Sequence, residues 1–69
     1  MKVGVLGTGY VGLVTSASLA AIDHDVIGMD LDPDKVASLQ RGRPTIFEPG
    51  LEKLIERGLA KKKLAFTDT

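Results

Sequence analysis

Three short apolar stretches alternate along the chain with segments in which apolar residues recur at helical spacing. The stretches lie at residues 2–6, 26–29 and 64–66 and have the length of strands. An apolar stretch without polar alternation suits a strand that is buried on both faces of a parallel sheet. We therefore predict three strands, with helices in the connections between them.

The first connection predicts a helix from Val11 to Ile22. This segment is rich in serine and alanine, whose small side chains allow a helix to pack closely on a sheet. The larger apolar side chains with which this helix is expected to pack are those of Val14, Leu19 and Ile22. Asp23 follows in the turn, where a left-handed backbone is expected; aspartate tolerates this conformation better than most residues.

The second connection predicts two more helices. Asp32 can cap the start of a short helix, with Pro33 at its first position, and Gly42 ends it. Pro49 is expected to open the third helix, and Gly58 resembles its exit. The apolar residues that recur on one face of each helix are Val36 and Leu39, then Leu51, Leu54 and Ile55.

The predicted order of elements, β-α-β-α-α-β, is typical of an α/β fold, the N-terminal part of a Rossmann-type doubly wound parallel sheet. Right-handed crossovers would place the strands side by side, with the first strand central and a cofactor across their carboxyl ends. A complete domain of this kind needs roughly 150 residues. We therefore expect residues 1–69 to be an N-terminal fragment of a dinucleotide-binding domain, without the remainder of that domain and without a substrate domain.

The pattern G-x-G-x-x-G joins the first predicted strand to the first helix. Gly7 lets the chain turn off the strand, Gly9 lets a pyrophosphate approach the backbone, and Gly12 lets the helix lie close to the sheet. Free N–H groups and the positive end of the helix dipole also favour a phosphate there. We call residues 7–12 the glycine elbow and predict that it binds a dinucleotide.

Asp30 follows the second predicted strand, about twenty residues after the glycine elbow, as the dinucleotide pattern requires. Its carboxylate can accept hydrogen bonds from both hydroxyls of the adenosine ribose, whereas a 2′-phosphate would meet like charge. NAD is therefore favoured over NADP. Lys35 lies in the first turn of the next helix, within reach of the ribose or the phosphate, although a lysine exposed to solvent is the simpler interpretation.

Composition excludes several other classes of function. The formal net charge is zero, so charge gives no reason to expect binding to nucleic acid or to an anionic membrane. The chain has no cysteine, which excludes a disulfide scaffold and a thiolate zinc site within it. Residues 3–22 carry no charge, but four glycines interrupt them, so a signal peptide or membrane segment is disfavoured and a cytoplasmic protein is expected.

Several of these residues together resemble the N-terminus of the UDP-glucose/GDP-mannose dehydrogenase family. They are G-T-G-Y-V-G at residues 7–12, then Asp30, Lys35 and Gly42, and finally I-F-E-P-G-L at residues 46–51. The resemblance covers essentially the whole chain and is closest to members that oxidise UDP-glucose. Its most specific part is the combination of G-Y-V-G with E-P-G-L some forty residues later.

The resemblance implies an NAD-dependent enzyme that oxidises the C6 alcohol of a nucleotide sugar to a carboxylate, consuming two NAD, as in the conversion of UDP-glucose to UDP-glucuronate for polysaccharide biosynthesis. It implies a cysteine thiolate that forms a thiohemiacetal and then a thioester. Those catalytic residues lie far downstream in the family, and none is present here. The nucleotide sugar would be bound mainly by downstream residues, and the full-length protein is expected to be a homo-oligomer.

By the same resemblance, cofactor-binding residues can be assigned by position. The phosphate loop corresponds to Gly7, Gly9, Tyr10, Val11 and Gly12, and the contacts to the adenosine ribose correspond to Asp30 and Lys35. The segment from Glu48 to Leu51 is expected to have a structural role, positioning the third helix.

The sequence leaves alternative functions open. GDP-mannose and UDP-N-acetylmannosamine dehydrogenases share this N-terminus, so the sugar is not specified. Hydroxyacyl and phosphogluconate dehydrogenases share the glycine elbow but are not expected to carry E-P-G-L. A dinucleotide-binding module without catalytic activity is the alternative from a different class of function.

Overall fold

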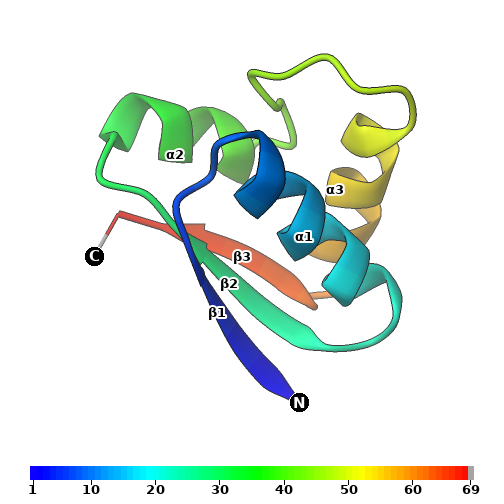
Figure 1. Cartoon of the computed structure of the whole chain (residues 1–69). Coiled ribbons are helices and arrows are strands. Elements are labelled where there is room, and N and C mark those ends of the chain that lie inside the picture. The colour runs from blue at the N-terminus through cyan, green and yellow to red at the C-terminus, as the bar shows by residue number, and fades with distance from the viewer. Residues whose placement is uncertain (69) are drawn as a thin grey trace.

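Three parallel strands and three helices follow one another in the order predicted from the sequence (Figure 1). The computed structural model describes residues 1–68. The elements are β1 (Lys2–Leu6), α1 (Tyr10–Ala21), β2 (Asp25–Met29), α2 (Pro33–Gln40), α3 (Leu51–Ala60) and β3 (Leu64–Thr67). The predicted α/β class is therefore confirmed, and most predicted boundaries agree within two residues.

The sheet has the order β1-β2-β3, so β2 is the middle strand of the three. Along β1 and β2, Val3 pairs with Val26 and Leu6 pairs with Met29. Because both crossovers step in the same direction, β1 and its glycine elbow lie at one edge of the described sheet. The prediction that the elbow follows the central strand is therefore wrong for this part of the chain.

All three helices cover the same face of the sheet (Figure 1), and side chains that point toward them, such as Val26, are buried. The opposite face is open in the described residues: the side chain of Leu6 is 82% exposed and that of Ile27 is 51% exposed. The expectation that the first strand is buried on both faces is thus not met here, because no described element covers the second face.

The core forms where α1 and α3 pack against each other and against the sheet. The buried apolar residues are Leu13, Ala17, Ala20, Val26, Val36, Leu39, Leu51, Ile55, Leu64 and Phe66. The prediction of Ile22 as a core residue is wrong: it is 67% exposed, because it follows the last residue of α1. Leu13 supplies the bulk instead, and the small Ala17 and Ala20 allow the helix to approach its neighbours closely.

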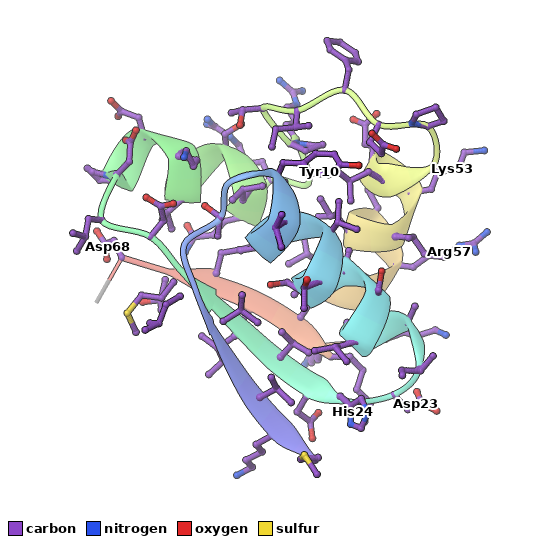
Figure 2. All side chains as sticks on the ribbon, viewed as in Figure 1. Tyr10, Asp23, His24, Lys53, Arg57 and Asp68 are labelled. Carbon is purple, nitrogen blue, oxygen red and sulfur yellow. The ribbon has the colours of Figure 1, made fainter. Side chains whose placement is uncertain are left out.

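Local chemistry sets both ends of α2. Its cap, Asp32, accepts hydrogen bonds from the backbone N–H groups of Asp34 (3.0 Å) and Lys35 (3.2 Å). Gly42 follows the helix with a φ of +76°, as expected for its exit. Asp23, which Figure 2 places in the turn before β2, has the predicted left-handed backbone with a φ of +73°.

Helix α3 differs from its predicted bounds at both ends. Pro49 lies outside the helix, and Gly50 is the residue that precedes its first turn, with a φ of +82°. At the other end, Gly58 is not the exit. It is buried inside α3, where an added Cβ would lie 2.9 Å from the Cβ of Leu64. Glycine is needed there for close contact with β3, and the left-handed exit residue is Lys62 (φ +59°).

This contact predicts the effect of Gly58→Ala. Alanine is the better helix former, but its methyl group would overlap Leu64, so we expect a loss of about 1–3 kcal/mol in stability. Thermal or urea unfolding of the protein that contains this chain measures the effect. The control is Lys53→Ala in the same helix, at a side chain that extends into solvent in Figure 2. Equal stability of both variants would contradict the proposed close contact.

Candidate functional site

The glycine elbow leaves β1 at its carboxyl end and runs directly into α1. Gly7 turns the chain with a φ of +87°, a conformation that residues with a side chain rarely adopt. Its N–H donates a hydrogen bond of 2.7 Å to the carbonyl oxygen of Met29, the last residue of β2. The elbow is therefore joined to the neighbouring strand by the backbone itself.

The other two glycines of the pattern have different surroundings. At Gly12, an added Cβ would collide with the carbonyl oxygen of Gly7, so the protein's own backbone requires glycine at this position. At Gly9, φ is −70° and an added Cβ would meet no atom within 4 Å. Nothing in residues 1–68 demands a glycine at position 9, and the space above it is free for a ligand that approaches the backbone.

The N-terminus of α1 offers hydrogen-bond donors that no side chain satisfies. Gly9 is its cap residue and makes no side-chain hydrogen bond to the helix, and the first turn contains no acidic residue. Tyr10 and Val11, which open the helix, are 53% and 73% exposed. The first N–H groups of a helix have no partner within it and lie at the positive end of its dipole. This turn can therefore accept an anion.

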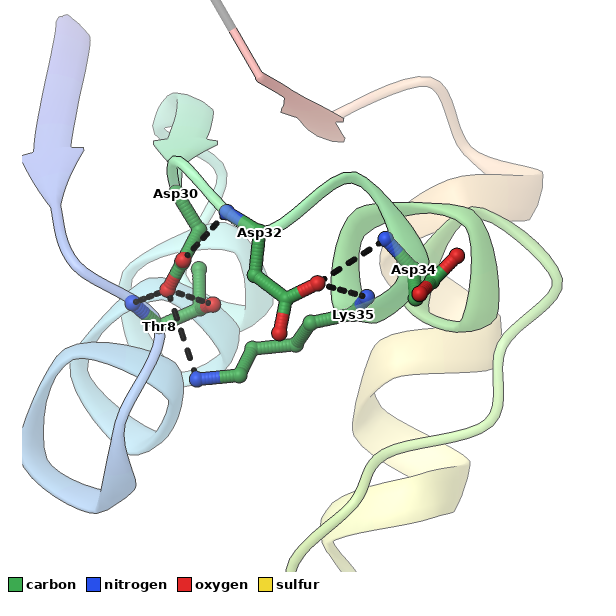
Figure 3. A network of polar contacts seen from close by, with 5 residues as sticks. All are labelled: Thr8, Asp30, Asp32, Asp34 and Lys35. Atoms are coloured by element: carbon green, nitrogen blue, oxygen red, sulfur yellow. Dashed lines mark hydrogen bonds and ion pairs between the residues drawn. The ribbon is translucent and has the colours of Figure 1, made fainter.

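Asp30 lies directly after β2, beside the glycine elbow (Figure 3). Its Oδ2 accepts hydrogen bonds from the backbone N–H of Thr8 (3.0 Å) and from the Thr8 hydroxyl (2.7 Å). Its Oδ1 accepts one from the backbone N–H of Asp32 (3.0 Å). The carboxylate is thereby held in one orientation at the carboxyl edge of the sheet.

These donors keep Asp30 ionised. The backbone N–H of Thr8 lowers its pKa most, followed by the Thr8 hydroxyl and the backbone N–H of Asp32; partial burial opposes them, and the charge of Lys35 adds a smaller lowering. The pKa of Asp30 is therefore well below its ordinary value. At neutral pH this side chain is an acceptor for hydroxyl groups and repels a second negative charge.

Lys35 lies in the first turn of α2 and extends back toward Asp30. Its Nζ is 3.5 Å from Oδ2 of Asp30, and its side chain remains 30% exposed (Figure 3). The structure thus brings together the two residues that the sequence assigned to the ribose. It also places a partly exposed positive charge beside the glycine elbow, where it can face an anion as well as Asp30.

All seven predicted site residues lie at the same edge of the sheet. They are Gly7, Gly9, Tyr10, Val11 and Gly12 in the glycine elbow, with Asp30 and Lys35 after the next strand. Thr8 was not predicted from the sequence, although it is fully buried and is the main partner of Asp30. The strand register could have indicated it: with Leu6 opposite Met29, the residues that follow β1 and β2 must be neighbours.

Residues 1–68 contain no group of three or more histidine, cysteine, aspartate and glutamate side chains that could hold a metal ion. No helix in the same range has the length and apolar character needed to cross a membrane. What the carboxyl edge of the sheet offers is a set of N–H donors for an anion on the glycine elbow, beside the Asp30 carboxylate for hydroxyl groups.

Comparison with known proteins gives one consistent family. The profile of the UDP-glucose/GDP-mannose dehydrogenase family, NAD binding domain, matches residues 1–69. A UDP-glucose 6-dehydrogenase from Rhizobium meliloti is 44% identical over 68 residues, which cover 99% of this chain and 16% of that protein. A GDP-mannose 6-dehydrogenase from Pseudomonas syringae pv. tomato is 43% identical over 67 residues, or 97% of this chain and 15% of that protein.

A solved structure of a nucleotide-sugar dehydrogenase is similar to this chain. A UDP-D-ManNAc dehydrogenase from Pyrococcus horikoshii superimposes with a TM-score of 0.96 at 33% identity. The match covers 100% of this chain and 16% of that structure. The chain therefore spans less than a fifth of the length of these proteins.

Proposed function

This chain belongs to the UDP-glucose/GDP-mannose dehydrogenase family, as the NAD-binding domain, and on that premise we propose that the glycine elbow, Asp30 and Lys35 bind NAD for a nucleotide-sugar dehydrogenase. The observation that carries this proposal is the open space over Gly9, at the uncapped N-terminus of α1, beside an ionised carboxylate. NAD, when bound, supplies the hydride acceptor. The residues of this chain bind and orient it.

The pyrophosphate belongs over the glycine elbow. Gly9 allows it to approach the backbone, and the N–H groups at Tyr10 and Val11 open the first turn of α1, where no side chain caps the helix. The contrast with α2 supports this assignment, because α2 is closed by the Asp32 carboxylate. At α2 the cap carboxylate supplies the negative charge, whereas at α1 no side chain does, and the adjacent space over Gly9 is open to a ligand.

The adenosine ribose belongs at Asp30. A carboxylate in this place accepts hydrogen bonds from ribose hydroxyls and disfavours the 2′-phosphate of NADP. Lys35 works against part of that discrimination because its charge, 3.5 Å from Asp30, attracts phosphate. The preference for NAD therefore rests mainly on the hydrogen bonds that Asp30 accepts from the ribose hydroxyls.

We further propose that residues 1–69 are the N-terminal part of the cofactor domain of a larger, oligomeric cytoplasmic enzyme. The relatives are about six times longer than the matched segment, and the chain contains no cysteine that could act as the nucleophile. In this proposal the segment binds NAD, and the sugar is held and attacked by residues outside it.

UDP-glucose is the proposed substrate, oxidised at C6 to UDP-glucuronate with two NAD. The test is NADH formation by the protein that contains this chain, with UDP-glucose, GDP-mannose and UDP-N-acetylmannosamine offered in turn. We expect two NADH per UDP-glucose consumed, since oxidation of an alcohol to a carboxylate releases four electrons. If the protein oxidises only one of the other two nucleotide sugars, that sugar is the substrate in place of UDP-glucose. Tight NAD binding without turnover would favour a non-catalytic dinucleotide-binding module.

Substitution of Gly9 tests the phosphate site. Gly9→Val places a branched side chain in the open space over the elbow, so NAD affinity should fall by about a hundredfold or more, while the smaller Gly9→Ala should lose less. Calorimetric titration with NAD measures the affinity. Because a Cβ added at Gly9 meets no atom within 4 Å, both variants should melt close to the wild type without NAD, whereas Gly12→Ala should melt lower. A folded Gly9→Val protein with unchanged affinity would disprove the phosphate assignment.

Substitution of Asp30 tests the ribose site. Asp30→Ala and Asp30→Asn should each weaken NAD binding by roughly tenfold to a hundredfold and narrow the preference for NAD over NADP, because both remove the ionised acceptor. Dissociation constants for the two cofactors, measured at one ionic strength, give the result. Asp34→Asn, an exposed carboxylate in the same segment, is the control. If Asp30 variants bind both cofactors like the wild type, Asp30 is not the ribose ligand.

A further inference from the structure

Thr8 occupies an unusual place for a residue in a ligand-binding loop. It is completely buried, although both neighbouring glycines are exposed. Its methyl group covers Gly28 in β2: a Cβ added there would lie 3.4 Å from Cγ2 of Thr8. This packing turns the Thr8 hydroxyl toward Asp30, to which it donates at 2.7 Å.

The donors around Asp30 are divided unevenly between its two oxygens. Oδ2 is approached by the N–H and the hydroxyl of Thr8 and by the ammonium group of Lys35. Oδ1 receives one donor, the N–H of Asp32. Because each carboxylate oxygen has about two lone pairs, Oδ2 is fully used by the protein and the spare acceptor capacity lies on Oδ1.

We propose that Thr8 is a positioning residue for the cofactor: its hydroxyl fixes the Asp30 carboxylate so that Oδ1 is presented to the adenosine ribose. This inference rests on the proposed function of the site. Thr8 does not contact the ribose in this scheme, and it acts only through Asp30. The low pKa of Asp30 agrees with it, since the two Thr8 donors are the main causes of the shift.

The same contact links two parts of the cofactor site. Thr8 lies within the glycine elbow, between the two residues that turn the chain and admit the pyrophosphate, while Asp30 belongs to the adjacent strand end. Since the N–H of Thr8 is committed to Asp30, the anion must be bound by donors further along, in the first turn of α1. A fixed Thr8 therefore also fixes the distance between the phosphate-binding turn and the ribose-binding carboxylate.

Thr8→Val tests the hydroxyl because valine keeps the shape and the backbone N–H. We expect NAD affinity to fall by about five- to tenfold, the effect of one charge-assisted hydrogen bond on a ligand contact, while NADP affinity changes little. Thr8→Ser keeps the hydroxyl and should restore most of the NAD affinity. Thr15→Val, at an exposed threonine of α1, is the matched control and should bind like the wild type.

A double-mutant cycle separates positioning from a general structural effect. If Thr8 acts through Asp30, then Thr8→Val should cause no further loss of NAD affinity in the Asp30→Ala background. Additive losses would overturn the inference. If Thr8→Val does not fold, Thr8→Ala replaces it in the same cycle.

The outcomes distinguish this inference from the proposed function. If Asp30→Ala weakens NAD binding and Thr8→Val does not, the ribose assignment stands and the positioning role of Thr8 is wrong. If neither change affects NAD binding, the assignment of the ribose to Asp30 fails. A loss in Thr8→Val that Thr8→Ser does not restore would also overturn the role of the hydroxyl.

Discussion

The close approach of Gly12 to the carbonyl of Gly7 is the contact on which the rest of the structure depends. Without a side chain at position 12, the first turn of α1 can begin directly on the elbow that leaves β1. That start directs α1 back along the sheet, where Ala20 lies against Gly58 of α3. It also leaves the helix N-terminus at the carboxyl edge of the strands. One steric constraint thus sets both the packing of the core and the place where an anion can bind.

The starts of α1 and α2 use the same physical chemistry for opposite purposes. Free N–H groups at a helix N-terminus attract negative charge in both cases. In α2 the charge is internal, because the Asp32 side chain caps the helix, and the result is a fixed element. In α1 the cap residue is Gly9, which has no side chain, and the donors remain available. A capping side chain at position 9 would stabilise α1 and remove the site, so an uncapped helix here is consistent with binding an external anion.

The family relationship fits a protein in which different segments bind the cofactor and the sugar. Relatives named for UDP-glucose, GDP-mannose and UDP-D-ManNAc match nearly the whole chain at 33–44% identity. The chemical groups that we assign to this segment are a pyrophosphate and an adenosine ribose, which belong to NAD and are the same whichever sugar is oxidised. A segment that binds only these groups can stay similar while the sugar-binding part of the protein changes. In the proposed function, the choice of sugar is made by residues outside this segment.

The parts of the structure that the sequence predicted well are those set by local chemistry. Asp32 with Pro33, and Gly42 with its positive φ, mark the ends of α2 through contacts within a few residues. The failure at Gly58 has a long-range cause: this residue looked like a helix exit, but its missing side chain makes room for Leu64. Thr8 was missed for the same reason, since its contact with Asp30 spans 22 positions and depends on the pairing of β1 with β2. Composition within a glycine-rich loop gives no sign of such a contact; the strand register does, and once the register is known a buried hydroxyl beside a carboxylate becomes the expected arrangement.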